Sequence, residues 1–111
     1  MPRDDRLFLD DMRDAIQAIR VYTEGMTYKA FAGDRKTIDA VVRNLEIIGE
    51  AAGHLSSTIR KSNREIEWKK IVALRNLLIH EYFGISKQIV WDIVKNKLDA
   101  LENFCVLATK E

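Results

Sequence analysis

The chain has 111 residues, of which 47% are hydrophobic and 32% are charged. This composition is that of an ordinary globular protein, so it excludes a disordered chain and a membrane-spanning one, and the length suits a single domain over residues 1–111. Eighteen basic and seventeen acidic side chains give a net charge of +1. Broad coating of nucleic acid by charge alone is therefore excluded, although a local basic site is not.

The N-terminus and the cysteine content indicate the compartment. The first residues are charged and contain no apolar segment followed by small residues, so they do not resemble a signal peptide, and a cytoplasmic location is expected. Cys105 is the only cysteine, which excludes an intramolecular disulfide and a cysteine zinc cluster. Its apolar sequence neighbours predict that it fills the core.

Apolar residues recur at helical spacing from the start of the chain, and no segment alternates as a strand would. The pattern predicts a first amphipathic helix over about residues 5–23, ended by Gly25. A short connection containing Phe31 and Gly33 follows. Asp34 is expected to cap a second helix that continues to about Arg60, and the polar segment after it is expected to be a loop.

Two further helices complete the predicted fold. The third is expected from Trp68 to about Tyr82, where Gly84 can end it. Ser86 is expected to cap a fourth helix that continues to the end of the chain. Four helices joined by short loops predict an all-α antiparallel four-helix bundle, or a bundle of five helices if one short helix is added.

The third helix differs from the others because apolar residues surround its axis. They are Ile71, Val72, Leu74, Leu77, Leu78 and Ile79. A helix that is apolar all round is normally buried on every side, and in a domain this small a second copy of the protein can cover the extra face. The sequence therefore predicts a two-fold homodimer that associates largely near the third and fourth helices.

Three polar residues lie within the apolar stretch of this helix, residues 71–80: Arg75, Asn76 and His80. Burying such groups without partners would cost on the order of a few kcal/mol each, so they need protein, water or substrate partners. Asn76 and His80 are four residues apart and share a face, whereas Arg75 and His80 are separated by about 140° around an ideal helix. The latter two can act on one ligand if the arginine reaches around, if the helix distorts, or if they meet their counterparts across a two-fold axis.

The segment from Arg75 to Tyr82, RNLLIHEY, has the form RNxxxHxY. It resembles the signature of the HepT-like proteins, a branch of the HEPN (higher eukaryotes and prokaryotes nucleotide-binding) superfamily. The segments RNLEIIGEAA (43–52), EIEWKKIVALRN (65–76) and HEYFGI (80–85) are also similar to that family, so nearly the whole chain is covered. Many relatives have proline before the tryptophan that opens the third helix, where this chain has Glu67, a residue that suits a first helical turn.

The resemblance implies a HEPN-like helical dimer and a specific biological role. It implies the toxin of a two-gene toxin–antitoxin module of the type VII kind, acting as a metal-independent ribonuclease on an RNA such as tRNA or mRNA. It also implies a cognate minimal nucleotidyltransferase antitoxin, of the MntA type, that transfers AMP to the tyrosine of the motif. Tyr82 is the matching residue.

The motif residues suit this chemistry on their own terms. A histidine such as His80 can move protons near neutral pH, and an arginine such as Arg75 can hold phosphate oxygens and stabilise charge in the transition state. Asn76 can orient the histidine or bind a sugar or base edge. Two histidines without nearby cysteines do not form a metal site, so neither a metal nor another cofactor is expected.

Other interpretations of the same residues remain open. The polar cleft could instead hold a nucleotide or dock the nucleotidyltransferase without cleaving RNA, and a purely structural dimer is a third possibility. Glu46, Glu50 and His54 lie with Arg43 near one side of the second helix, either as a solvated or interfacial ion network or in contact with the cleft.

Trp68 and Trp91 are expected to anchor packing. Gly49 is expected to allow close approach of two helices, because glycine otherwise weakens a helix by about 1 kcal/mol.

Overall fold

A computed structural model describes residues 3–81 and 86–110. These residues form helices and no strand, which confirms the predicted all-α class. The helices are α1 (Arg3–Thr23), α2 (Tyr28–Ala32), α3 (Arg35–His54), α4 (Ser57–Ser62), α5 (Trp68–Glu81), α6 (Lys87–Asn96) and α7 (Leu98–Thr109). None of these helices is both long enough and apolar enough to cross a bilayer.

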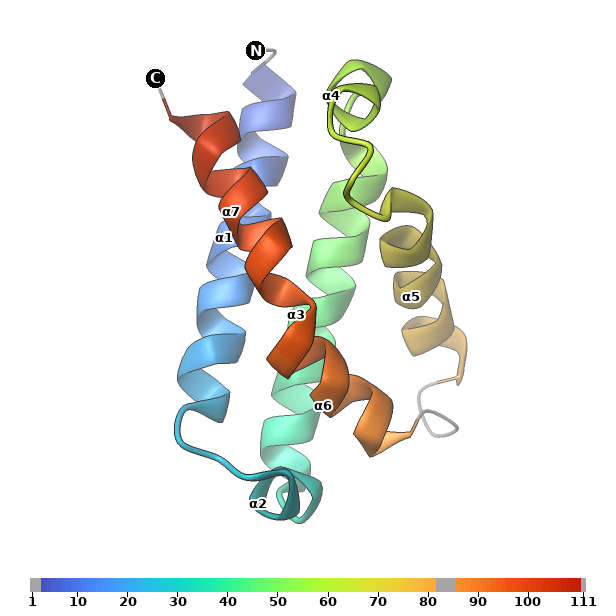
Figure 1. Cartoon of the computed structure of the whole chain (residues 1–111). Helices are drawn as coiled ribbons and strands as arrows, with labels where there is room; N and C mark the ends of the chain where they lie inside the picture. The colour runs from blue at the N-terminus through green and yellow to red at the C-terminus, as the bar shows by residue number, and fades with distance from the viewer. Residues whose placement is uncertain (1–2, 82–85, 111) are drawn as a thin grey trace.

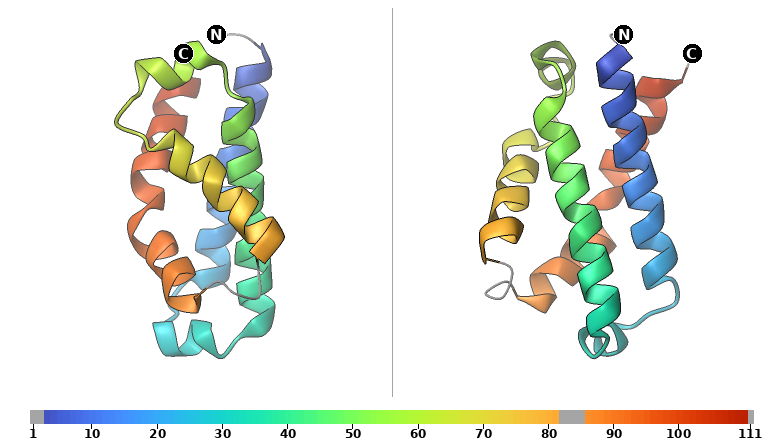
Figure 2. Two further views of the ribbon diagram at one scale, coloured as in Figure 1. Left: turned by 90° about the vertical axis from the view of Figure 1, so that its right-hand side faces the viewer. Right: turned by 180° about the vertical axis from the view of Figure 1, so that it is seen from behind.

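The long helix α3 lies at the centre of the bundle (Figure 1). It packs against α1 on one side and against α5 on another, while α7 packs against α1. The short helix α2 closes one end, and α4 lies at the other end near both termini (Figures 1 and 2). The arrangement is a bundle of long helices with two short helical connections, consistent with the predicted architecture.

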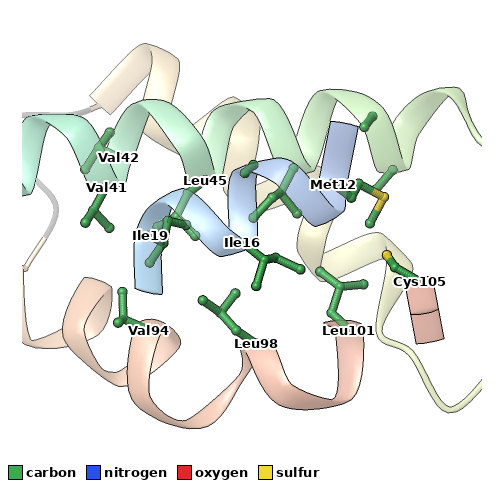
Figure 3. Packing of buried hydrophobic residues seen from close by; sticks show 14 of the residues in the cluster. Met12, Ile16, Ile19, Val41, Val42, Leu45, Val94, Leu98, Leu101 and Cys105 are labelled. Carbon is green, nitrogen blue, oxygen red and sulfur yellow. The ribbon is translucent and has the colours of Figure 1, made fainter. Parts of the chain in front are cut away.

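The core lies between α1, α3 and α7, because their apolar stripes face one another. Figure 3 shows part of this cluster, which includes Leu9, Met12, Ile16, Ile19, Val41, Leu45, Leu98, Leu101 and Cys105. Cys105 is 0% exposed, and burial raises the pKa of its thiol to about 12. The prediction that this cysteine fills the core is confirmed.

The second predicted helix is two helices, because α3 ends at His54 and the expected continuation to Arg60 is wrong. Leu55 has extended backbone angles (φ −64°, ψ 144°), and Ser56 caps the separate helix α4. The carboxylate of Asp5 in α1 accepts hydrogen bonds from the backbone N–H of Ser56 at 2.8 Å and from its hydroxyl at 2.7 Å. These contacts hold Ser56 outside the helix, and they join residues far apart in the sequence.

The last predicted helix is also interrupted. Ser86 caps α6 as expected, but the helix ends at Asn96, and Lys97 (φ −113°, ψ −12°) separates it from α7. The N–H of Lys97 still bonds to the carbonyl of Ile93 at 3.0 Å, so the chain turns without losing that backbone hydrogen bond. The two parts pack against different neighbours, α6 against α2 and α7 against α1, which accounts for the change of direction.

Both tryptophans anchor packing, as expected. Trp68 at the start of α5 is buried, its indole N–H donates to the carbonyl of Asn63 at 3.1 Å, and its ring meets the ring of Phe104 edge-on at 5.1 Å. Trp91 packs against Phe31 of α2, with ring centroids 4.9 Å apart. Trp68 thereby anchors the start of α5 to the core.

Candidate functional site

The helix that carries the sequence motif packs against α3 (Figure 2). The two helices approach each other closely at Gly49, where the side-chain stem of Arg75 lies against the glycine backbone. The expectation that Gly49 permits close helix approach is therefore confirmed. Arg75 enters the contact between the two helices and does not project freely into solvent.

The guanidinium of Arg75 has two partners. Its Nη2 donates to Oε2 of Glu50 on α3 at 2.7 Å, and its Nη1 donates to the side-chain oxygen of Asn76 at 3.0 Å. Its Nε is enclosed and has no hydrogen-bond partner in the described part of the chain. An arginine has five N–H donors, so these two bonds leave N–H groups on both terminal nitrogens for an anion.

Glu50 is the residue that joins α5 to a wider polar network. Besides Arg75 it contacts His54, whose Nε2 lies 3.5 Å from Oε1 of Glu50. The positive charge of Arg75, the hydrogen bond from Arg75 and then the contact with His54 hold the pKa of Glu50 below its ordinary value. The ring of His54 stacks on Phe8 of α1 with centroids 4.9 Å apart, so the network spans α1, α3 and α5.

Arg75 lines a groove of about 340 Å³ between α1, α3 and α5. The groove also contains Phe8, Asp11, Arg43, Glu46, Ile47, Glu50, Ala51 and Ile79. Both alternatives for the polar residues of α3 are observed. Arg43 pairs with Glu46 at 3.7 Å and His54 with Glu50 at 3.5 Å, and Arg43, Glu46 and Glu50 also line the groove. Three carboxylates and two guanidinium groups line this surface, so the groove as a whole is not positively charged.

His80 lies five residues beyond Arg75, about 1.4 turns of helix, and is exposed at the surface. Because α5 is helical without interruption from Trp68 to Glu81, the two side chains point in different directions, and within this range no helix distortion brings them together. Among the described residues none hydrogen bonds with His80, and Asn76 bonds to Arg75 instead. Tyr82 and Gly84 lie outside the described residues.

The contact between Glu50 and Arg75 was not predicted from the sequence. The signal that could have suggested it is the arginine itself, because a guanidinium on a largely apolar helix needs a carboxylate nearby. Choosing among the seventeen acidic residues of the chain requires knowing which helix packs against α5.

Within the described ranges, no group of three histidine, cysteine, aspartate or glutamate side chains is arranged to hold a metal ion.

Comparison with known proteins assigns the family. The model of the ribonuclease HepT-like family matches residues 12–107, which include α3 and the whole of α5. The chain belongs to the ribonuclease HepT-like family. The family resemblance seen in the sequence motif is therefore confirmed, and Arg75, Asn76 and His80 all lie inside the matched region.

Curated relatives agree with this assignment. One from Methanocaldococcus jannaschii, provisionally named an RNase, is 43% identical over 99 residues, which cover 88% of this chain and 82% of that protein. A probable ribonuclease HepT from Thermococcus cleftensis is 35% identical over 102 residues, covering 92% of this chain and 93% of that protein. No solved structure matches the chain significantly.

Proposed function

We propose that this protein is a metal-independent endoribonuclease and the toxin of a toxin–antitoxin module, with Arg75 and His80 as its catalytic residues. The observation that carries the proposal is the arrangement on α5. One helix of a ribonuclease HepT-like chain presents a guanidinium at a groove and, five residues later, an exposed imidazole. These are a phosphate-binding group and a proton-transfer group on a single rigid element.

The reaction that these groups support is attack by an RNA 2′-hydroxyl on the adjacent phosphorus. His80 takes the hydroxyl proton as the 2′-oxygen forms its bond to phosphorus, and the bond from phosphorus to the 5′-oxygen breaks. The products are a 2′,3′-cyclic phosphate and a 5′-hydroxyl, the latter after the leaving oxygen gains a proton. Arg75 donates to the phosphate oxygens, whose negative charge increases in the transition state.

A second protomer would complete the site. Within one protomer Arg75 is held by Glu50 while His80 points elsewhere, so a cleft shared across a two-fold axis is the arrangement in which both could reach one phosphate. Leu77 and Ile79, which lie between them in the sequence, are 43% and 45% exposed. An open groove of about 380 Å³ between α5 and α6–α7 is lined largely by apolar side chains, including Ile71, Leu74 and Ile93. These uncovered apolar surfaces support dimerisation near α5, α6 and α7.

Control of the toxin is proposed to depend on Tyr82, which directly follows the last residue of α5. In the family that the motif resembles, a cognate minimal nucleotidyltransferase transfers AMP from ATP to this tyrosine. Tyrosine provides a nucleophilic hydroxyl, and attack on the α-phosphorus of ATP would form a phosphodiester and release pyrophosphate. The added phosphate and its nucleoside would obstruct the RNA site and compete for the donors of Arg75.

The experiment that tests the proposed activity is RNA cleavage by the purified protein and by Arg75→Ala and His80→Ala. Each variant is expected to lose activity by about a hundredfold or more and to stop inhibiting growth, while helical content stays near that of the parent. Arg3→Ala, which removes an exposed arginine from α1, is the control and should cleave normally. Cleavage by both folded catalytic variants at the parent rate would show that the assignment is wrong.

The alternative function is a non-catalytic module that binds a nucleotide or docks the nucleotidyltransferase. One observation favours it. The carboxylate of Glu50 already accepts a hydrogen bond from the guanidinium of Arg75, which leaves fewer of its N–H groups for an RNA phosphate. A parent protein that binds ATP or the nucleotidyltransferase, yet leaves RNA intact, would support this function over the ribonuclease.

A further inference from the structure

A second groove lies at the junction of α4 and α5, apart from the groove that contains Arg75. It has a volume of about 540 Å³ and is lined by five basic side chains: Arg60, Lys61, Arg64, Lys69 and Lys70. Residues 57–70 contain five basic and two acidic residues, a net charge of +3, whereas the whole chain has +1. The remaining residues therefore carry a net charge of −2, and positive charge is concentrated at this junction.

Most of these basic groups are free to bind an external anion. Glu67 pairs with Lys70 at 2.6 Å, but no other residue in the described ranges forms an ion pair with Arg60, Lys61, Arg64 or Lys69. Lys61, Arg64 and Lys69 are exposed, and Arg60 is half-buried with an enclosed Nε that has no hydrogen-bond partner among the described residues. The groove thus presents four cationic side chains that have no ion-pair partner in the part of the chain that the structure describes.

The base of this groove is structurally fixed. Ile66 and Trp68 line it and are each 8% exposed. Because Trp68 is buried and its ring meets the ring of Phe104 edge-on, the tryptophan supports the groove and is not free to stack on a base. The features of the groove are cationic side chains held on an apolar base, which suit a phosphate backbone more than a base edge.

We propose that the groove between α4 and α5 binds the phosphate backbone of the RNA substrate, outside the catalytic site. The proposal rests on the proposed ribonuclease function and deepens it. The groove lined by Arg75 contains more carboxylates than guanidinium groups, so the charge needed to attract RNA must come from elsewhere on the protein. The basic groove is at the start of the same helix that carries His80 near its end, roughly 18 Å away at 1.5 Å per residue. An RNA strand of a few nucleotides can span that distance.

The test compares two variants that change the net charge equally. One replaces Lys61, Arg64 and Lys69 with glutamine, and the other replaces Lys29, Lys36 and Lys95, exposed lysines on α2, α3 and α6, with glutamine. Binding to a fluorescently labelled single-stranded RNA of about twenty nucleotides is measured by anisotropy at several salt concentrations. Every nucleotide carries a 2′-O-methyl group, so the probe cannot be cleaved by 2′-hydroxyl attack, and binding is measured whether or not the protein is a ribonuclease.

The groove variant is expected to bind about tenfold more weakly or worse at moderate salt. The slope of log K against log salt should become less steep by about 2, since each phosphate contact on a single strand contributes about 0.7. The control variant should keep the parent slope. Circular dichroism checks folding, and the single variants Lys61→Gln and Lys69→Gln provide the same comparison if the triple variant does not fold.

Three outcomes would overturn the proposal. An unchanged salt slope in the groove variant would show that no phosphate is bound there, and equal weakening in both triple variants would show an effect of net charge alone. A groove variant that keeps RNA binding but loses the nucleotidyltransferase would identify the groove as a protein-docking surface. A different result would separate the two proposals. If the parent does not cleave ordinary RNA but its salt slope still depends on the groove residues, the catalytic proposal is refuted and the RNA-binding site stands.

Discussion

Gly49 and Arg75 approach so closely that a Cβ atom added to Gly49 would lie 2.3 Å from the Cβ of Arg75. It would also lie 3.1 Å from the carbonyl oxygen of Ile71, so the obstruction includes the backbone of α5. Neither atom belongs to the flexible end of a side chain. Any side chain at position 49 must therefore move α5 away from α3 and take the guanidinium of Arg75 away from Glu50.

Gly49→Ala is expected to destabilise the fold by about 1–3 kcal/mol, as overpacking does, and to reduce RNA cleavage. Gly53→Ala is the matched control, because it lies one turn further along α3 and its added Cβ would meet only side-chain atoms of Val72 at 3.8 Å and beyond. The control is expected to stabilise the protein by up to about 1 kcal/mol, since alanine favours a helix. Urea unfolding of the two variants measures the difference, and equal stability would refute the close contact.

The helix periodicity was visible in the sequence because residues such as Met12, Ile16 and Ile19 repeat at the spacing of one helix face. The interruptions at Leu55 and Lys97 were not. The first depends on Asp5, about fifty residues earlier in the chain, and the second on the separate packing of α6 and α7. Periodicity reports one face of a helix and carries no information about distant hydrogen bonds.

The candidate site shows the same division. Arg75, Asn76 and His80 could be selected because polar residues in an apolar helix require an explanation. The pairing of Arg75 with Glu50 could not, because it depends on the packing of α3 against α5. The sequence identified the side chains that are chemically suited to a site, and the fold determined which of them are in contact.

The Glu50 carboxylate provides a pH test of the contact between α3 and α5. Arg75 lowers the pKa of Glu50 below the ordinary 4.5, first through its charge and then through its hydrogen bond, and His54 contributes less. The pair is therefore expected to stabilise the fold above about pH 4.5 and to lose this contribution as the pH falls through the lowered pKa. NMR titration of the Glu50 side-chain carboxyl carbon should show a raised pKa in Arg75→Gln and a smaller rise in His54→Gln. A titration that is identical in all three proteins would contradict the observed contact.

Dimerisation can be tested at two exposed apolar residues of α5. Leu77→Asp combined with Ile79→Asp should convert a dimer to a monomer without unfolding it, because both side chains are already exposed in one protomer. Val21→Asp replaces a 66% exposed residue on α1 and serves as the control that should remain dimeric. Sedimentation velocity at micromolar concentration measures the outcome. A parent protein that is a monomer under these conditions would remove the shared cleft from the mechanism.

Cleavage is expected to persist in excess EDTA, because the proposed reaction uses an imidazole and a guanidinium and no bound metal. A metal-dependent nuclease assayed in the same buffer should lose its activity and thereby show that chelation is complete. Loss of RNA cleavage in EDTA with recovery on adding Mg²⁺ or Mn²⁺ would contradict the metal-independent mechanism.

Silencing through Tyr82 predicts a change in mass. Incubation with the cognate nucleotidyltransferase, ATP and Mg²⁺ should add AMP-sized increments to the parent protein and abolish RNA cleavage, whereas Tyr82→Phe should keep its mass and remain active. The phenylalanine differs only by the hydroxyl that would attack ATP, so binding of the partner should be preserved. Tyr22→Phe, which changes an exposed tyrosine of α1, is the control and should be modified like the parent. Intact-mass spectrometry and a cleavage assay on the same samples measure both effects. If the parent is silenced with no change in mass, or if Tyr82→Phe is silenced as readily as the parent, the partner acts by covering the site, and covalent transfer to this tyrosine is not the mechanism.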